Sequence, residues 1–106
     1  MSWRKGYSGE RKAKQELEAM YGKLNVIKVA ISQFGADFLV FEEGEMMLIV
    51  EVKETTKIKY SPLIKEKHQF ERIMQFAKLH KCPAELWIYY KRGFGTLTGK
   101  EVRSLN

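Results

Sequence analysis

The first part of the chain repeats apolar residues at the three- and four-residue spacing of an amphipathic helix. The inward positions are Ala13, Leu17, Met20, Tyr21 and Leu24. Ser8 is a suitable N-cap before this stripe, and Gly22 is a common residue at a helix end. The pattern therefore predicts a first helix from about Ser8 to Gly22.

Three extended segments follow, over residues 24–31, 34–41 and 46–53, all rich in Val, Ile, Phe and Leu. The acidic stretch Glu42-Glu43-Gly44-Glu45 between the last two predicts a β-hairpin. A polar loop over residues 54–62 leads to a second predicted helix, from about Lys65 to His80. The inward positions of this helix are Phe70, Ile73, Met74 and Ala77.

Pro83 introduces another predicted strand over residues 84–90, followed by a shorter extended piece around 94–97. Thr98 and Glu101 have the spacing of a capping box, which predicts a short closing helix over Val102 and Leu105. A central mixed sheet flanked by helices fits this order best. We expect an α/β fold that forms a single domain over residues 1–106.

Four charged residues lie at positions where the pattern expects the core: Glu10, Asp37, Glu51 and Lys53. A buried charge is costly unless it is paired, hydrogen-bonded or bound to a metal, so four of them indicate a shared site. Glu10 alone has a simpler explanation, because an acidic residue in a first helical turn complements the helix dipole.

The register of the hairpin decides whether two of these carboxylates meet. A two-residue turn at Glu43-Gly44 sets Asp37 opposite Val50, with Asp37 and Glu51 on different faces. A three-residue turn, or a one-residue bulge, sets Asp37 opposite Glu51 on one face. A shared site therefore requires one of these two irregularities.

Two carboxylates and a lysine in this arrangement fit metal-dependent phosphodiester hydrolysis. Mg²⁺ prefers oxygen ligands and retains water, so Asp37, Glu51 and the backbone carbonyl of Val52 are the expected ligands. Lys53 shares the face of Glu51, and we expect it to orient the attacking water and offset negative charge. Glu10 would bind the metal through water or orient that water.

The composition favours a polyanionic partner. The 19 Lys and Arg against 13 Asp and Glu give a formal charge of +6. Basic residues near the expected site are candidate phosphate contacts, although a solvated surface explains them nearly as well: Arg4, Lys5, Arg11, Lys12, Lys57, Lys59, Lys65 and Lys67. The single cysteine, Cys82, excludes an internal disulfide. With no membrane-length apolar run and no signal-peptide pattern, we expect an intracellular protein.

These residues resemble a known nuclease family. Glu10, the triplet Gly35-Ala36-Asp37 and the triplet Glu51-Val52-Lys53 are similar to the PD-(D/E)XK signature, with Ala36 where proline often stands. The opening Lys5-Gly6-Tyr7-Ser8-Gly9-Glu10-Arg11 resembles the start of archaeal Holliday junction resolvases. The resemblance extends through the hairpin and the second helix to Lys91.

The resemblance implies a restriction-endonuclease-like fold, cleavage of branched DNA with Mg²⁺, for which Mn²⁺ can substitute, and a homodimer with one site per subunit. It also implies a catalytic serine, for which Ser32 is the matching residue. The segment before Asp37 is shorter than in those resolvases, so Ser32 is equally well explained as a turn residue. Two alternatives remain open: another nuclease of the same superfamily, and a basic DNA-binding module that does not cleave.

Overall fold

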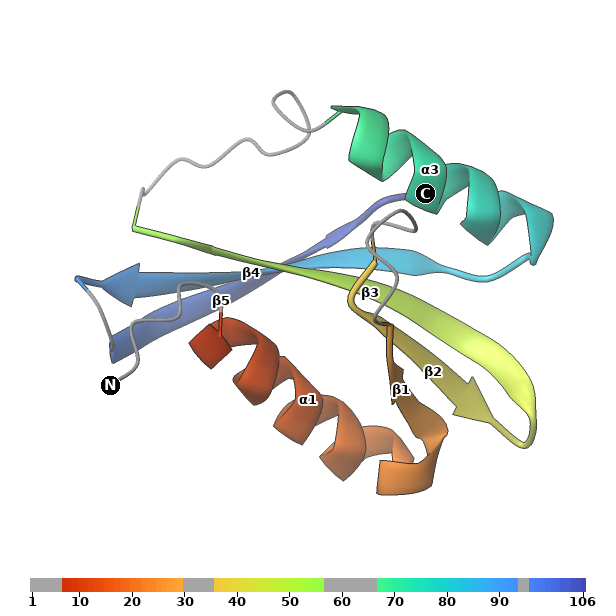
Figure 1. The fold of residues 1–106 in the computed structure, drawn as a ribbon, viewed down its shortest axis with the longest axis horizontal. Coiled ribbons are helices and arrows are strands. Elements are labelled where there is room, and N and C mark those ends of the chain that lie inside the picture. The colour runs from red at the N-terminus through yellow and green to blue at the C-terminus, as the bar shows by residue number, and fades with distance from the viewer. Residues whose placement is uncertain (1–6, 30–35, 57–66, 94–95) are drawn as a thin grey trace.

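The computed structural model describes residues 7–29, 36–56, 67–93 and 96–106. A five-stranded sheet crosses the middle of the molecule, with α1 against one face and α3 against the other (Figure 1). The elements in chain order are α1 (Tyr7–Tyr21), the 3₁₀ helix η1 (Lys23–Asn25), β1 (Val26–Lys28), β2 (Phe38–Glu42), β3 (Glu45–Thr55), α3 (Lys67–Leu79), β4 (Ala84–Arg92) and β5 (Thr96–Ser104). This arrangement confirms the predicted α/β class.

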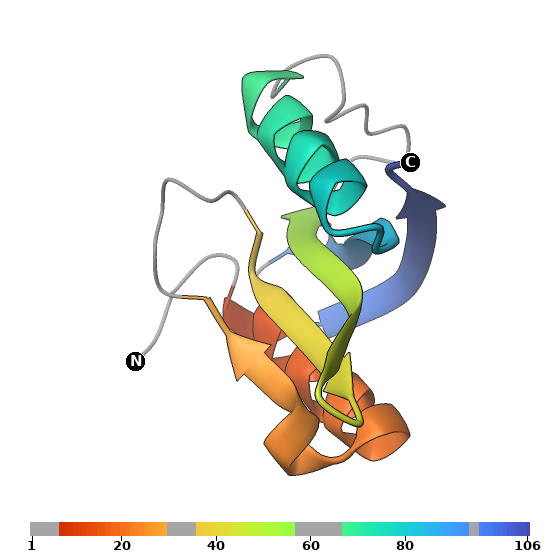
Figure 2. The same cartoon turned by 90° about the vertical axis from the view of Figure 1, so that its right-hand side faces the viewer.

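The strand order in the sheet follows the chain, β1-β2-β3-β4-β5. Neighbouring strands are antiparallel except β3 and β4, which are parallel, so the sheet is mixed as predicted. The parallel pair requires a crossover between its two strands, and α3 lies in that connection. The sheet is strongly twisted when it is viewed from the side (Figure 2).

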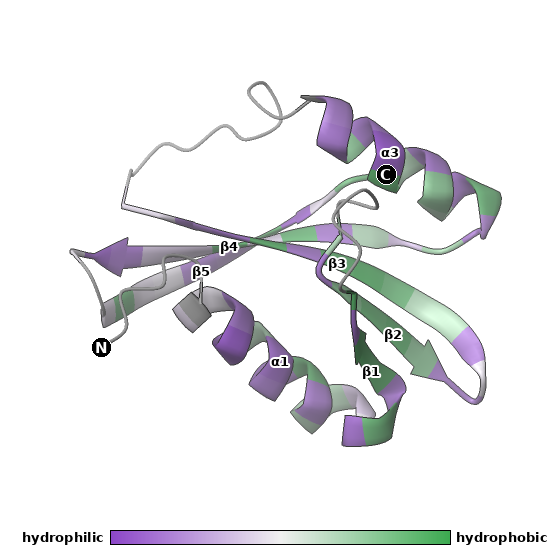
Figure 3. Ribbon diagram, in the orientation of Figure 1, coloured by the Kyte–Doolittle hydropathy of each residue, from purple (hydrophilic) through white to green (hydrophobic). Residues whose placement is uncertain are grey.

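Alternate residues of β3 serve two separate cores. Val50 and Val52 pack with Ala13 and Leu17 of α1, while Ile49 packs with the apolar residues of α3. β3 is therefore apolar on both faces through its middle, where its ribbon is green in Figure 3, as is most of β2. Because Glu51 and Lys53 follow Ile49 at two-residue steps, they face α3, whereas Glu54 faces α1.

The two long helices agree with the sequence pattern to within about two residues at each end. Two residues of the first helix that were predicted to face inward do not. Ala13 and Leu17 are fully buried, but Met20 is 63% exposed and Leu24 is 94% exposed. The predicted positions of Met20 and Leu24 are wrong: Tyr21, four residues after Leu17, continues the packed face of α1, and Leu24 lies beyond the end of α1, in η1. No helix in the described ranges is long and apolar enough to cross a membrane.

The predicted closing helix is also wrong, because residues 96–104 form β5, which pairs antiparallel with β4. Thr98 does not cap a helix: its hydroxyl donates to the carbonyl of Tyr90 at 3.3 Å. Val102 is 46% exposed and Leu105 is buried. Pairing with an open strand edge outweighed a local capping pattern.

Candidate active site

A one-residue bulge in the β2–β3 hairpin sets the register of the site. The turn has two residues, Glu43 and Gly44, whose φ values of 53° and 82° are those of a type I′ turn. Phe41 pairs with Met46 but Val40 pairs with Leu48, so Met47 is the extra residue. The three-residue turn was therefore the wrong alternative, and the one-residue bulge is confirmed.

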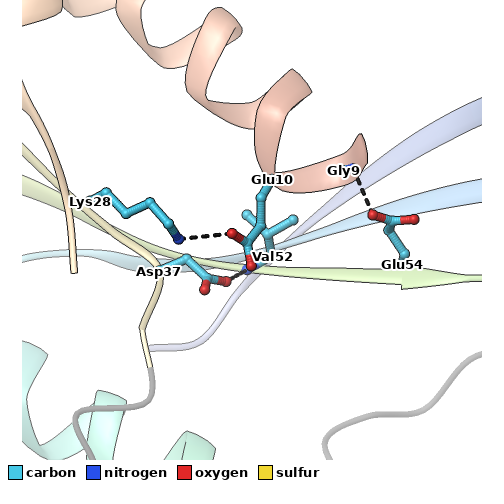
Figure 4. Close-up of polar contacts among 6 residues, drawn as sticks. All are labelled: Gly9, Glu10, Lys28, Asp37, Val52 and Glu54. Atoms are coloured by element: carbon cyan, nitrogen blue, oxygen red, sulfur yellow. Dashed lines mark hydrogen bonds and ion pairs between the residues drawn. The ribbon is translucent and has the colours of Figure 1, made fainter. Parts of the chain in front are cut away.

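Beyond the bulge, Phe38 pairs with Val50, so Asp37 comes beside Glu51. The Asp37 N–H donates to the Val50 carbonyl at 2.9 Å, and Asp37 Oδ2 accepts the Val52 N–H at 2.7 Å. Figure 4 shows this contact next to the side chain of Glu10. The carboxylate of Asp37 thus forms a hydrogen bond to the backbone of β3 just before β2 begins at Phe38.

Glu51 lies in the most buried part of this cluster and is 3% exposed. Its Oε2 is 3.4 Å from Lys53 Nζ and accepts a hydrogen bond from Gln69 Nε2. Gln69 Oε1 in turn accepts from Lys53 Nζ at 3.4 Å. One side-chain amide from α3 therefore contacts both charged residues of the Glu-Val-Lys triplet.

Burial and the neighbouring Asp37 raise the pKa of Glu51 to about 9, against an ordinary value of 4.5. The desolvation of the carboxylate is the larger cause, the hydrogen bond with Asp37 comes next, and Lys53 opposes both. Two carboxyl groups this close are difficult to ionise together without a further positive charge. Lys53 supplies one positive charge here, and a bound cation would supply a second.

The donor set fits a hard divalent ion such as Mg²⁺. No three His, Cys, Asp or Glu side chains within the described ranges are grouped to hold a metal. The oxygen donors are instead the pair Asp37 and Glu51, with the backbone of Val52 on the same side of β3 as Asp37. Mg²⁺ is commonly bound by one or two carboxylates, with waters and substrate phosphate completing the shell.

Glu10 reaches the site from the first turn of α1, on the opposite face of the sheet from Glu51. Its Oε2 is 2.8 Å from Nζ of Lys28 on β1. In Figure 4 the carboxylates of Glu10 and Asp37 both point toward the strand at Val52. Glu10 thus approaches the strand at Val52 from the α1 face and pairs with Lys28, and it is not grouped with Asp37 and Glu51 as a third carboxylate among the described residues.

The structure leaves some expected residues undescribed. Ser32 and five of the candidate basic residues lie outside the described residues: Arg4, Lys5, Lys57, Lys59 and Lys65. Lys67 begins α3, but its side chain lies outside the description too. Arg11 and Lys12 are exposed on α1. Arg11 lines an open hollow of about 450 Å³ with Glu10, Lys14, Lys28 and Phe38.

Two contacts of the site were not assigned from the sequence. Gln69 stands four residues before Ile73 and eight before Ala77, so a polar residue on the inward stripe of α3 was the available signal. Lys28 gave no such signal, because its pairing with Glu10 depends on how α1 packs beside β1.

The fold matches that of a solved nuclease. Over 94% of this chain and 72% of the other, it is similar to Hjc of Archaeoglobus fulgidus, a Holliday junction resolvase from an archaeal hyperthermophile, with a TM-score of 0.61 and 18% identity. The chain therefore has a restriction-endonuclease-like fold. The family model of archaeal Holliday junction resolvases (Hjc) matches residues 1–100, and the chain belongs to this family. No curated protein gives a significant match.

Proposed function

We propose that this protein is a Mg²⁺-dependent endonuclease that resolves four-way DNA junctions by paired phosphodiester hydrolysis. Membership of the resolvase family supports a nuclease that acts on junction DNA. The observation that carries the proposal is the bulge, which brings Asp37 beside Glu51 while Lys53 and Gln69 contact the same carboxylate. A regular hairpin ladder would separate the two carboxylates onto opposite faces.

A divalent ion held by Asp37, Glu51 and the Val52 carbonyl would supply Lewis acidity at the scissile phosphate and lower the pKa of a water. The protein keeps the two carboxylates in place through the Val52 N–H and the Gln69 amide. These supports matter because ligand groups act only when their orientation is fixed before the substrate arrives.

Lys53 is the group that we expect to orient the attacking water and offset negative charge. Its ammonium lies between Glu51 and Gln69 and is 19% exposed at the side chain, so it is held in place yet accessible to substrate. An ammonium there offsets the negative charge that develops on the phosphate and donates a hydrogen bond to the attacking water. Glu10 would orient water from the other side of the strand.

The basic surface serves the DNA backbone. Arg11 and Lys14 line the hollow next to Glu10, where phosphates flanking the cut would meet positive charge. We propose that two copies act together as a homodimer, because a two-fold arrangement supplies one site for each of two symmetry-related strands. A domain of 106 residues has little surface for reading a long base sequence, so DNA shape is the expected basis of selection.

The test is a comparison of four synthetic substrates with the purified protein: a four-way junction, a plain duplex, a flap and a single strand. The expected result is Mg²⁺-dependent cleavage of the junction at paired positions and weak or no cleavage of the others. Equal cleavage of the flap or duplex would indicate another nuclease of this fold rather than a junction resolvase. Binding without cleavage in Mg²⁺ or Mn²⁺ would favour the DNA-binding module.

A further inference from the structure

Glu54 is a buried charge on β3 that the proposed chemistry does not use. Its side chain is 4% exposed and faces α1, on the opposite side of β3 from Lys53. It has two partners: the Gly9 N–H, which donates to Oε2 at 2.6 Å, and Lys91 Nζ of β4, 3.0 Å from Oε1. A carboxylate this buried needs such partners, and both come from other elements.

Gly9 belongs to the first turn of α1, where backbone N–H groups have no acceptor within the helix. The carboxylate of Glu54 supplies the acceptor, and its negative charge also complements the positive end of the helix dipole. Glu54 therefore caps α1 from the middle of the sheet. Figure 4 shows the contact at the tip of the helix, one residue before Glu10.

The contact brings Glu54 so close to Gly9 that any side chain at position 9 would displace the carboxylate. A Cβ at position 9 would lie 2.7 Å from Glu54 Cγ and 2.9 Å from Oε2. Glycine is otherwise a poor residue inside a helix, so its presence here is explained by the close approach of the carboxylate. Lys91, which is 14% exposed at its side chain, balances the charge that approaches the helix.

We propose that Glu54 is a positioning residue that fixes the start of α1 and, through Gly9, the place of Glu10 on the α1 side of β3. This inference rests on the proposed function of Glu10, but the anchoring of α1 is a separate physical statement. Glu54 acts through the backbone N–H of Gly9 and is not one of the expected metal ligands.

The variants that test the proposal are Glu54→Ala, which removes the acceptor, and Gly9→Ala, which pushes the carboxylate away while improving intrinsic helix propensity. The matched control is Glu16→Ala. Glu16 is also on α1 and accepts a hydrogen bond from Tyr89 of β4 at 2.5 Å, but it lies almost two turns farther along the helix. Glu16→Ala therefore removes a contact between α1 and the sheet but leaves the start of the helix unchanged.

The first measurement is amide hydrogen exchange at Gly9 and Glu10 in the free protein. Glu54→Ala is expected to raise the exchange rate of the Gly9 amide by about 10-fold or more, because a lost hydrogen bond permits local opening. Glu16→Ala is expected to leave it unchanged. An unchanged exchange rate of the position 9 amide in a folded Glu54→Ala protein would overturn the proposed anchor, whatever the cleavage assay shows. If Glu54→Ala does not fold, the same measurement on Gly9→Ala decides.

The second measurement is the single-turnover cleavage rate of a four-way junction in a double-mutant cycle with Glu10→Ala. Glu54→Ala and Gly9→Ala are each expected to slow cleavage by about 10-fold when Glu10 is present, which is the usual scale for a supporting residue. In the Glu10→Ala background the same substitution is expected to cost less than about 2-fold, since coupled residues are not additive. Equal losses in both backgrounds would overturn the link to Glu10. A native protein that cuts no junction, while Gly9 exchange still responds to Glu54, would instead refute the proposed function.

Discussion

Three charged side chains of β3, Glu51, Lys53 and Glu54, are largely buried and have separate roles. Glu51 and Lys53 face α3, where Gln69 contacts both of them. Glu54 faces α1 and meets Gly9 and Lys91 instead. The two-residue period of a strand therefore assigns neighbouring charges to two different tasks, the proposed chemistry on one face and the anchoring of a helix on the other.

Gln69→Leu tests the support that α3 gives to the site. The substitution keeps the size and inward position of the side chain but removes both hydrogen bonds to Glu51 and Lys53. We expect junction cleavage to fall by about 10-fold while DNA binding is unchanged, as for other groups that orient metal ligands. The control is Gln75→Leu, an exposed position on the same helix. Equal rates in the two variants would show that Gln69 does not support the site.

The pH dependence of stability tests the environment of Glu51. In metal-free protein its carboxyl has a pKa of about 9 when folded and about 4.5 when unfolded. Between these values the folded state binds more protons than the unfolded state, so stability falls as the pH rises. Glu51→Gln removes this loss.

We therefore expect the Tm of Glu51→Gln, measured in EDTA, to exceed that of the native protein by a margin that grows from pH 5 to pH 9. The margin should disappear below about pH 4.5, where both states are protonated. A constant margin across this range would mean that Glu51 is not held in its protonated form by burial and Asp37.

At the scale of elements, the β2–β3 hairpin decides whether a site exists at all. The type I′ turn fixes the pair Glu42 and Glu45, and the bulge at Met47 then moves the register by one residue before Asp37 is reached. Bulges commonly occur beside active sites because they redirect side chains. The turn and the bulge act together: the two-residue turn without the bulge, or the bulge combined with a three-residue turn, would place Asp37 away from Glu51.

Glu43→Asn tests the turn. Glu43 has a φ of 53°, a left-handed conformation that costs a β-carbon residue roughly 1 kcal/mol and that asparagine adopts more readily. We expect the free energy of unfolding, measured by urea denaturation, to rise by about 0.5–1 kcal/mol. Cleavage should be unchanged because the register is unchanged. Glu42→Asn is the control outside the turn centre. A loss of stability in Glu43→Asn would contradict the assigned turn.

The sequence predicted the long helices, most strands and the acidic pair, because period and spacing carry those features. Asp37 and Glu51 interrupt apolar runs, so each was visible as a residue out of place. For the register, the sequence left two alternatives, a three-residue turn and a one-residue bulge. The pattern of apolar residues did not distinguish them.

Other features depend on contacts that no local pattern records. The start of β5 was predicted as extended, but the part after Thr98 was predicted as a helix because Thr98 and Glu101 match a capping box. That part pairs with β4 instead. The contact between Glu54 and Gly9 joins residues 45 positions apart, and nothing in the spacing of either indicates it. The roles of the metal ligands stay predictions.

For the whole molecule, the two helices cover opposite faces of one sheet, and the proposed site lies where the sheet passes between them (Figures 1 and 2). The formal charge of +6 favours contact with the DNA backbone. Shape-selective binding through phosphates is the mode that suits this charge and this size.

Salt dependence tests that mode of binding. With the non-cleaving Asp37→Asn variant, we expect the affinity for a four-way junction to fall by about 100-fold or more between 50 and 200 mM salt, as several phosphate contacts are screened. Replacing Arg11 and Lys12 with methionine should reduce the slope of log Kd against log salt by about one to two. An affinity that is independent of salt would contradict backbone recognition.

The most direct test of the central claim is the cleavage of one four-way junction, labelled in turn on each strand, by the native protein, Asp37→Asn and Glu51→Gln. We expect paired cuts by the native protein only when Mg²⁺ is present. In both variants we expect normal junction binding with cleavage reduced by more than about 100-fold, since a bound metal contributes several kcal/mol. Cleavage by both variants at the native rate would show that Asp37 and Glu51 are not the centre of the reaction.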